Sequence, residues 1–499
     1  MNDALITEEP PKLRPAHLRV QPSAADGGHF YADRVRVYPA SVAGNARRIK
    51  WALLVLCLAV YYVVPWIRWN RGPRLPDQAV LLDIAGRRAY FLDLIIWPQQ
   101  IYLLTGALIL GAVGLFFVTS LFGRIWCGYF CPQTVWTDLF LWVERLLEGD
   151  ANQRRKRDEG PGSFDRTWRK IVKHSVWMLI AFGTGGAWIM YFIDGPTLVR
   201  EFWSGQAETA TYFFVGLFTL TTYLLAGWAR EQVCTYMCPW PRFQSAMFDD
   251  QTLAVSYRAW RGEPRGRHKT GETWEGRGDC VDCFRCVSVC PTGIDIRDGM
   301  QLECIGCGLC VDACGAIMEK VGRPKGLIAW DTAAGLSAAA KGVPVPYRLL
   351  RPRTIMYAAL LSVVLVAVGV ATLVRQRLDL SVDRDRTPNF VTLSNGQIRN
   401  GYTLRVENRT TVPAHFILSL DGLDGAKLRI GSEGADPGAL DVAPNQVATF
   451  RVFVQAPKAS LRRQSTPIRL TVTDSAHDRL QTDSSVFVGP ASLDHRAGG

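Results

Sequence analysis

Long uninterrupted runs of apolar residues alternate with polar stretches along this chain, and five of these runs predict membrane-spanning helices. None of the five contains Asp, Glu, Lys or Arg, and they lie at roughly 51–67, 101–122, 175–193, 209–229 and 354–374. Each is close to the ~20 residues that a helix needs to cross ~30 Å of hydrocarbon. The first run lies far from the N-terminus and no small-residue cleavage site follows it, so we interpret it as a span rather than a signal peptide. A single soluble globule is excluded.

Beyond the last span the pattern changes to short runs in which apolar and polar residues alternate. These runs fall within 381–488, Gly, Asn, Asp and Pro separate them, and they read FVTLS, YTLRVEN, HFILSL, KLRI, ATFRVFVQ, IRLTVTD and SSVFVG. Several short strands at this spacing predict an all-β sandwich of immunoglobulin type. No catalytic constellation appears in the tail, so we expect it to have an interaction or spacing role.

Lys and Arg residues, which give the chain of 499 residues a formal net charge of +12, predict the orientation of the spans. The stretch 124–174 holds ten of them and 230–353 holds seventeen, whereas 194–208 holds one. We therefore expect the first two stretches and the N-terminus on the cytoplasmic side and the C-terminal tail outside. The basic residues are spread over loops with no recognition-helix or stacked-aromatic pattern, so nucleic acid is not an expected partner.

The connector 68–100 carries five Arg residues although this orientation places it outside. We expect Arg87 and Arg88 to lie on an interfacial amphipathic stretch, with Tyr90 and Trp97 as anchors. A second amphipathic segment, 135–148, has a helical stripe of Trp, Leu and Val, and we expect it to lie along the membrane surface or to dock a partner.

Eight of the thirteen cysteines form the sharpest chemical signal in the chain. Residues 280–314 contain the pattern Cys-x2-Cys-x2-Cys-x3-Cys twice, which is the spacing of bacterial two-cluster ferredoxins. Three thiolates on a tight loop bind one cubane, and the fourth reaches the other cluster. We therefore expect two 4Fe–4S clusters, one held by Cys280, Cys283, Cys286 and Cys314 and the other by Cys304, Cys307, Cys310 and Cys290.

Two zinc sites are the alternative for these eight cysteines, but zinc sites usually separate two Cys-x2-Cys pairs by a longer spacer. Gly306, Gly308 and Gly315 favour close backbone packing around a cluster in the second copy. The matching positions of the first copy carry bulkier residues, so we expect two different cluster environments. These bulkier residues are Asp282, Phe284 and Pro291.

An internal repeat forms the second signal. RIWCGYFCP at 124–132 and EQVCTYMCP at 231–239 share the core Cys-x-Tyr-x-Cys-Pro, and each follows the cytoplasmic end of a predicted span. A spacing of four residues places both sulfurs on one face of a helical turn. If the two hairpins pack around a pseudo-two-fold axis, four thiols converge on one site, made by Cys127, Cys131, Cys234 and Cys238.

Four thiolates at one place could bind Cu(I), zinc or a further iron–sulfur cluster, or could work as two redox dithiols. Four buried cysteines that end helices are the plainer alternative, and the repetition argues against it. Met237 could add a thioether, although packing is the commoner role of a Met. We interpret Cys57, in the first span, as a packing residue and His174 as an interfacial residue.

These patterns predict a multi-domain membrane protein with an α-helical transmembrane bundle of about five spans. A bacterial-type two-cluster ferredoxin α+β domain is inserted into it, and a C-terminal immunoglobulin-like sandwich follows. We expect a cytoplasmic N-terminal segment, a four-span membrane domain with both Cys-x3-Cys-Pro hairpins, a cytoplasmic ferredoxin-like domain, a fifth membrane helix and a periplasmic domain. Their respective bounds are 1–50, 51–257, 258–353, 354–374 and 375–499.

The motifs resemble those of the cytochrome c oxidase accessory protein family, known as CcoG, FixG or RdxA. The resemblance covers nearly the whole chain and departs at no cysteine position, and it rests on RVYPASVAG, WCGYFCPQTVW, CTYMCPWPRFQSAMFD, the eight-cysteine run and KVGRPKGLI. It implies a polyferredoxin of the bacterial inner membrane that reduces Cu(II) to Cu(I) and assists assembly of a cbb-type oxidase. The eight cysteines would hold the clusters, and the repeat cysteines would be a redox or copper site.

Three functions compete at this point. The first is a metalloreductase that serves copper insertion, with oxidase subunits or copper-delivery proteins as partners. The second is a quinol dehydrogenase module that feeds a periplasmic reductase, for which Glu231, Asp138 and His174 are candidate residues. The third is a scaffold without enzymatic activity whose clusters sense redox state. The electron donor, the metal at the four-cysteine site and the oligomeric state, of which a homodimer is one option, stay open.

Overall fold

The computed structural model describes residues 36–490 apart from 73–74, 269–270, 344–345, 375–377, 411–412, 432–439, 445, 462 and 475–478. The chain divides into two compact units, of which the first is Met1–Asn70 with Pro76–Gly369 and the second is Arg71–Leu75 with Val370–Gly499. The eight-cysteine segment belongs to the first unit with the membrane helices, apart from the last turn of the helix Pro352–Leu373, which falls in the second.

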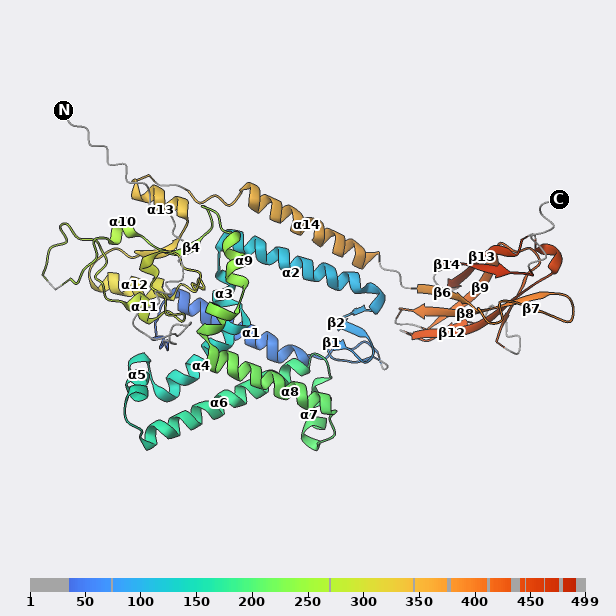
Figure 1. The fold of residues 1–499 in the computed structure, drawn as a ribbon, viewed down its shortest axis with the longest axis horizontal. Coiled ribbons are helices and arrows are strands. Elements are labelled where there is room, and N and C mark those ends of the chain that lie inside the picture. The colour runs from blue at the N-terminus through green and yellow to red at the C-terminus, as the bar shows by residue number, and fades with distance from the viewer. Residues whose placement is uncertain are drawn as a thin grey trace, which may run out of the picture. The chain divides into compact units, whose positions relative to one another are not determined.

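Helices dominate the first unit (Figure 1). Four stretches in the described residues are long and apolar enough to cross a membrane, namely Asn45–Trp66, Pro98–Phe122, Thr209–Ala229 and Pro352–Leu373. Their helices are α1 (Asn45–Val63) with η1 (Val64–Trp66), η2 (Pro98–Gln100) with α2 (Ile101–Phe122), α8 (Thr209–Thr222) with the π-helix η3 (Tyr223–Ala229), and α14 (Pro352–Leu373). They match four of the five predicted spans.

The remaining predicted span, 175–193, is helical but is not among these four. It lies in α6 (Phe164–Ile189), which begins with the charged turns that contain Asp165, Arg166 and Lys173. Gly183, Gly185 and Gly186 also lower the mean hydropathy of its apolar half. The helix packs against α8, where Gly185 comes so close that an added Cβ would lie 2.8 Å from the carbonyl oxygen of Val215.

Shorter helices connect these elements. They are α3 (Ile125–Tyr129), α4 (Pro132–Glu148), α5 (Ala151–Glu159), α7 (Gly195–Ser204), the π-helix η4 (Val233–Met237) and α9 (Trp240–Ala246). The stretch 135–148 lies in α4, where Trp142 and Leu146 stay exposed while much of the helix packs into the protein. Its apolar Phe140 and its acidic Asp138 and Glu144 are all buried, because α4 packs against α6 and η3.

The connector 68–100 forms a small antiparallel sheet rather than an interfacial amphipathic stretch. Its strands are β1 (Val80–Asp83), β2 (Arg88–Phe91) and β3 (Leu94–Ile96), in the order β1-β2-β3. Tyr90 and Trp97, the expected interfacial anchors, are instead buried. The guanidinium of Arg88 lies 4.0 Å from the centre of the Trp97 ring, so a cation–π contact accounts for a charge in this connector.

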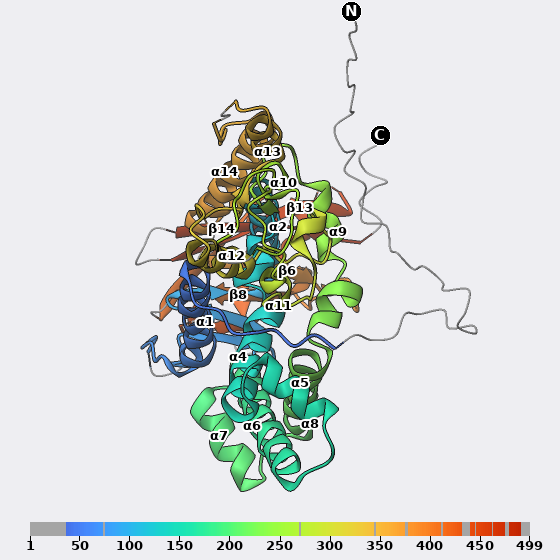
Figure 2. The ribbon, with the colours of Figure 1, turned by 90° about the vertical axis from the view of Figure 1, so that its left-hand side faces the viewer.

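The eight-cysteine segment is framed by β4 (Ala254–Tyr257) and β5 (Ile328–Asp331), which pair antiparallel. Between them lie α10 (Ala259–Gly262), α11 (Arg285–Ser288), η5 (Ile296–Asp298) and α12 (Leu309–Lys320), and α13 (Ala333–Ala340) follows. These elements gather at one end of the first unit, the end that faces the viewer in Figure 2. The sheet adds Ala254–Tyr257 to the cluster fold, just ahead of the expected boundary at 258.

The second unit is a β-sandwich, as predicted. One sheet has the order β10-β12-β8-β6, with β7 also pairing with β8, and the other has the order β11-β9-β13-β14. The strands are β6 (Leu378–Arg384), β7 (Val391–Thr392), β8 (Ile398–Asn408), β9 (Ala414–Asp421), β10 (Lys427–Ile430), β11 (Leu440–Val442), β12 (Gln446–Ala456), β13 (Ser465–Asp474) and β14 (Arg479–Val488). Alternate residues of the long strands fill the core, among them Tyr402, Leu404, Val452, Val454 and Leu470.

Candidate iron–sulfur and four-cysteine sites

The second cysteine set surrounds a cavity. Cys290, Cys304, Cys307 and Cys310 all line it, together with Ile305 and apolar side chains of the neighbouring segments. Cys290 belongs to the first sequence copy and the other three belong to the second copy. The cavity therefore brings together the four thiols that the crossed ferredoxin pairing assigns to one cluster, and Cys286 of the other set lines it as well.

The electrostatic neighbours of the thiols follow the same crossed pattern. Burial raises the pKa of Cys314 to about 12, and the charges of Cys286, Cys280 and Cys283 add to the rise. Burial likewise raises the pKa of Cys310, whose charged neighbours are led by Cys307, Cys304 and Cys290. Without iron these thiols are protonated, so cluster binding has to release their protons.

The residues therefore fit two 4Fe–4S clusters. The donors are thiols in two sets of four, the second set encloses a void, and apolar side chains such as Val255, Ile296 and Leu327 pack around them. Among the described residues, no three His, Cys, Asp or Glu side chains are close enough together to hold a single metal ion. A cubane is larger than one ion and needs its four ligands spread around a void.

Glycines of the second loop lie where the sequence predicted close packing. Gly306 and Gly308 have φ values of 65° and 71°, and a Cβ on Gly306 would lie 3.2 Å from the carbonyl carbon and oxygen of Arg124. A Cβ on Gly308 would lie 3.2 Å from the Cβ of Ala46 in α1. Gly315 has open space around it instead. The close approach is thus to the membrane helices, on one side of the loop.

The four repeat cysteines lie at helix ends in both hairpins. Cys127 is in α3 and Cys131 is the extended N-cap of α4, whereas Cys234 is in η4 and Cys238 is its extended C-cap. The expectation that each pair shares one face of a helical turn is therefore wrong. A residue before proline is driven out of the helical region, and Pro132 and Pro239 follow the second cysteine of each pair.

The thiols of the two hairpins are near enough to influence one another's charge, although no three of them, within the described residues, are placed to hold a single metal ion. Burial raises the pKa of Cys127 to about 12, and the charges of Cys131, Cys234 and Cys238 contribute to the rise while Arg124 opposes it. Burial also raises the pKa of Cys234 to about 12, with Cys131 and Cys238 as its next contributors. The Cys127 thiol donates a hydrogen bond to Oε1 of Gln244 at 3.2 Å, which orients the sulfur.

The first hairpin packs directly on the second cluster loop. Cys127 and Cys234 belong to one apolar cluster with Ile305 and Cys307. A Cβ on Gly128 would lie 2.9 Å from the Cα of Cys307, so only glycine fits between the two motifs without a shift. The hydroxyl of Tyr129 donates a hydrogen bond to the Cys307 carbonyl at 3.0 Å. One sequence motif therefore lies against the other, which the spacing did not predict.

Arg124, the residue before this motif, fastens the same loop. Its Nη1 donates hydrogen bonds to the carbonyl oxygens of Gln301 and Cys304, at 3.0 Å each, and also to Leu302. The side chain is buried, and its guanidinium lies 5.6 Å from the centre of the Phe248 ring. A basic residue that the orientation rule counted as a topology signal thus holds the loop that leads into the second cluster motif.

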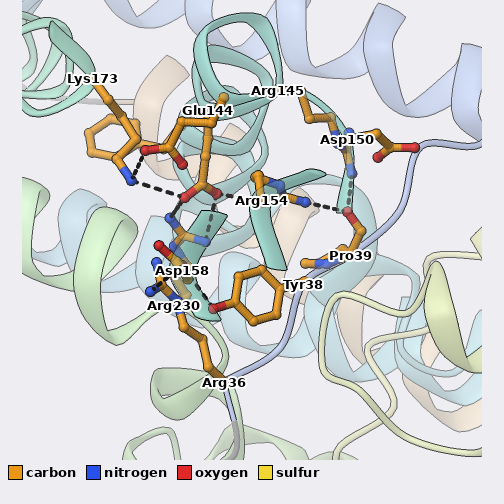
Figure 3. Close-up of polar contacts among 12 residues, drawn as sticks. Arg36, Tyr38, Pro39, Glu144, Arg145, Asp150, Arg154, Asp158, Lys173 and Arg230 are labelled. Carbon is orange, nitrogen blue, oxygen red and sulfur yellow. Dashed lines mark hydrogen bonds and ion pairs between the residues drawn. The ribbon is translucent and has the colours of Figure 1, made fainter. Parts of the chain in front are cut away.

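The second hairpin is held by one buried carboxylate (Figure 3). Glu144 of α4 pairs with Arg154 at 2.7 Å, Arg230 at 2.9 Å and Lys173 at 3.3 Å. Burial alone would raise the pKa of Glu144, but Arg230, Arg154 and Lys173 lower it to about 2. Arg230 has a φ of 42°, which is a costly backbone conformation for a residue with a side chain. Glu144 thereby fixes the strained residue that precedes Cys234.

A short N-terminal segment joins the same network. Arg154 donates a hydrogen bond to the Pro39 carbonyl at 2.7 Å, and Tyr38 donates one to Asp158 at 2.8 Å, as Figure 3 shows. The backbone N–H of Ala40 donates to the Ser288 carbonyl beside the first cluster loop. The sequence motif RVYPASVAG therefore ties the cluster fold to α4 and α5.

The other residues singled out from the sequence are dispersed. Asp138 is bound by both of its oxygens to Nη1 of Arg47, at 2.9 and 2.8 Å. Glu231 and His174 line one cavity, and the His174 ring lies 2.9 Å from the Tyr223 hydroxyl. Met237 is exposed, away from a ligand position in a buried site. Cys57 is half-buried in α1, in keeping with a packing role.

Sequence patterns of known families match three parts of the chain. The family described as "4Fe-4S dicluster domain" matches residues 229–333, and "4Fe-4S binding domain" matches residues 104–148, which include Cys127 and Cys131. The family described as "IG-like fold at C-terminal of FixG" matches residues 368–490. The clusters and the immunoglobulin-like domain predicted from the sequence are thus confirmed.

Whole-chain relatives settle the family. "Nitrogen fixation protein FixG" of Rhizobium meliloti is 43% identical over 91% of this chain and 92% of its own length. "Protein RdxA" of Cereibacter sphaeroides is 47% identical over 86% of this chain and 91% of its own length. The chain belongs to the FixG/RdxA family. Both alignments cover most of this chain and most of the relative.

Two further similarities cover parts of the FixG/RdxA-type chain. "Ferredoxin-type protein NapH" of Haemophilus influenzae is 25% identical over 42% of this chain and 65% of its own length. The solved structure of a FixG-related protein from Vibrio parahaemolyticus covers 23% of this chain and 97% of its own, with 24% identity and a TM-score of 0.21.

Proposed function

We propose that this protein is a membrane-anchored electron-transfer protein that reduces Cu(II) to Cu(I) at its four repeat cysteines and assists assembly of a cbb-type cytochrome oxidase. The observation that carries the proposal is the contact between Gly128 and Cys307. It places the hairpin of Cys127 against the second cluster loop, with Cys234 packed in the same apolar cluster. Short separation between a reducing centre and a thiol site is what electron delivery to a bound metal requires.

The chain's own residues provide the rest of the chemistry. When bound, each of the two clusters supplies one electron at a time. Four thiolates favour Cu(I) over Cu(II), because soft sulfur ligands suit the softer ion. Each copper takes up one electron, so two copper ions use the two electrons that the reduced protein stores. Copper binding would release to water the protons that burial otherwise keeps on the thiols of Cys127 and Cys234.

The proposed arrangement keeps the topology inferred from Lys and Arg. The cluster fold and both hairpins lie on the cytoplasmic side, and the sandwich lies on the periplasmic side, where it docks oxidase subunits or copper-delivery proteins. The membrane and these proteins are the proposed partners. The domain bounds expected from the sequence are retained, with the cluster fold starting at Ala254.

Copper reduction by the anaerobically purified, pre-reduced protein tests the proposal. The comparison variant carries Ser at Cys127, Cys131, Cys234 and Cys238, and iron is counted in both proteins. We expect wild-type protein to produce Cu(I), and the variant to keep its iron and produce none. Equal reduction by both proteins would mean that the clusters act on copper without the four cysteines, and the proposal would fail.

A specific observation favours one second candidate, in which a membrane quinol is oxidised. Glu231 and His174, two of the three residues suggested for that role, line one cavity with Trp177 and Trp228. An adjoining apolar groove between α6 and α8 shares His174 and Lys170 with it. A His and a carboxylate beside aromatic rings suit a quinol head group. The test is reduction of the clusters by a short-chain quinol. Reduction in the wild-type protein and its loss in Glu231→Gln and His174→Phe variants would support this candidate over an unrelated electron donor.

A further inference from the structure

Lys50 is a buried cation with little negative charge to balance it. The residue lies in the second turn of α1, on the face that also buries Arg47 and Leu54, and its exposed fraction is 4%. Within the described residues its one ion pair joins Nζ to Oδ2 of Asp138 at 3.9 Å. That distance is too long for a hydrogen bond.

Asp138 already forms a closer ion pair with Arg47. Both of its oxygens accept hydrogen bonds from Nη1 of Arg47, at 2.9 and 2.8 Å. Two cations, Arg47 and Lys50, thus share one carboxylate in a buried place. The lining of the cavity beside Lys50 holds two carboxylates, Asp138 and Glu231, against three cations, Lys50, Arg145 and Arg230, so positive charge is in excess there and favours a further anion.

The cavity that Lys50 lines shows where that anion belongs. Its walls include Cys234 of the second hairpin and Ile305 and Leu309, which flank Cys307 on the second cluster loop. Thr292 and Ile305 line both this cavity and the cavity of the second cysteine set, so the two cavities adjoin. Lys50 therefore lies between the second cluster loop and the four-cysteine site.

A cluster held by four thiolates is an anion, and it gains one more negative charge on reduction. We propose that the ammonium group of Lys50 is the counter-charge of the second cluster and raises its reduction potential. Lys50 is a positioning residue in this role, because it acts through the cluster and touches no substrate. The inference rests on the proposed assignment of Cys290, Cys304, Cys307 and Cys310 to that cluster, and it does not depend on copper.

The same placement explains why the cation is on α1. The N–H groups of Ala46 and Arg47, in the first turn of α1, donate to the carboxylate of Asp312 in the cluster helix α12. A Cβ on Gly44 would overlap that carboxylate, so the chain has glycine at the helix start. Asp312 thereby fixes the position of α1 along its axis relative to the cluster fold. Lys50 lies one turn further along α1.

Redox titration of the full-length protein, loaded with both clusters and followed by electron paramagnetic resonance, tests the proposal. In Lys50→Met we expect one midpoint potential to fall, by roughly tenfold in the reduction equilibrium or about 59 mV, while the other moves less. Lys50→Arg keeps the charge and should stay near wild type. Lys320→Met, which removes an exposed cation from α12, should leave both potentials unchanged. Unchanged potentials in Lys50→Met, or equal shifts in Lys50→Met and Lys50→Arg, would overturn the proposal.

Thermal unfolding with and without iron gives a second readout. Lys50→Met removes an uncompensated charge from the iron-free protein, so that form should be at least as stable as iron-free wild type. In the iron-loaded protein the order should reverse. Equal destabilisation of both forms would mean that Lys50 serves packing alone. An iron content below two clusters in the wild-type protein would refute the proposed cluster assignment instead, so the two failures are distinguishable.

Discussion

The two cluster loops share a spacing and a backbone shape, but they face different surroundings. Asp282 and Phe284 in the first loop have φ values of 51° and 55°, and Gly306 and Gly308 at the same places in the second loop have 65° and 71°. Both loops thus need left-handed backbone at these points, which costs about 1–2 kcal/mol for each residue with a side chain. Only the second loop avoids that cost.

The surroundings explain the difference. The first loop is open: the side chain of Phe284 is 53% exposed and Cys283 is exposed. The guanidinium of Arg297 covers one face of the Phe284 ring at 4.2 Å. The second loop is enclosed by Arg124 and α1, which leave little room for a Cβ on Gly306 or Gly308, whose nearest neighbours would lie at 3.2 Å. Glycine here reflects contact with the membrane motif, whereas the first loop leaves the ligand Cys283 exposed.

Substituting single cluster ligands should have the largest effect, because it removes one cluster and spares the other. Cys290 lies in the first loop but belongs to the second set, so Cys290→Ser and Cys307→Ser should leave the same surviving cluster. Cys314→Ser should instead match Cys283→Ser. Each change should remove about half of the iron, because one 4Fe–4S cluster loses a ligand. Iron counting and electron paramagnetic resonance check this, and a match between Cys290→Ser and Cys283→Ser would disprove the crossed pairing.

Removing the carboxylate that holds the second hairpin should have the next largest effect. Glu144→Gln leaves Arg154 and Arg230 buried without their anion, and breaking such a buried pair costs about 3–5 kcal/mol of unfolding free energy. The exposed pair of Glu159 and Arg155 offers the control, since Glu159→Gln should change stability little. Denaturant unfolding in detergent measures both variants. Equal stability of the two would contradict the anchoring role of Glu144.

The same carboxylate predicts a pH dependence. Its pKa is 4.5 in the unfolded chain and about 2 in the folded protein, so the folded state favours the charged form. The stabilisation is therefore fully present above pH 4.5 and is lost as pH falls toward about 2. The stability gap between wild type and Glu144→Gln should narrow across that window. If this difference in unfolding free energy stays constant from pH 5 down to about pH 2, ionisation of Glu144 is not its cause.

Substitution by alanine should distinguish the two loops by a smaller difference in unfolding free energy. Gly306→Ala places a side chain in left-handed backbone against Arg124, at a cost of about 1–3 kcal/mol in unfolding free energy. Phe284→Ala truncates an exposed side chain of the first loop and introduces no backbone clash. It should cost less than about 1 kcal/mol in unfolding free energy. Thermal unfolding of iron-loaded protein compares them. A larger loss in Phe284→Ala would reverse our reading of which loop is enclosed.

The matching tyrosines of the two hairpins give the smallest contrast. Tyr129→Phe removes the hydrogen bond to the Cys307 carbonyl and should cost about 0.5–1.5 kcal/mol. Tyr236 holds the same place in the second hairpin but is 70% exposed, so Tyr236→Phe should be neutral. Unfolding measurements on both variants decide the matter, and indistinguishable effects would mean that the Tyr129 hydroxyl contributes nothing to the contact.

Local patterns in the sequence predicted the parts of the molecule that depend on local spacing. The cysteine spacing predicted a 4Fe–4S dicluster domain, and alternation predicted seven of the sandwich strands. It missed β6, which begins directly after the last span and its flanking residues, and β11, which has three residues. Short strands offer too few alternating positions to stand out from a loop.

Local sequence patterns could not predict the contacts between distant segments. The Tyr129 hydroxyl and the Cys307 carbonyl are 178 positions apart, and no local pattern pairs them. The burial of Glu144 and Lys50 had no local signal, because burial of a charge is decided by packing. One available signal was the glycine at 128, since the second hairpin has Thr235 at the same place. The Cys-Pro steps were another, because proline excludes a helical second cysteine.

The central claim is that the four-cysteine site lies beside the second cluster and apart from the first. Co(II), a paramagnetic ion that thiolates bind, reports on it directly in the reduced full-length protein. We predict a sulfur-to-cobalt absorption band and broadening of only one of the two cluster resonance signals, the one lost in Cys307→Ser. Both effects should vanish in the variant with Ser at Cys127, Cys131, Cys234 and Cys238. Cobalt that binds through these four cysteines and broadens both signals, neither, or the one lost in Cys283→Ser would contradict the account.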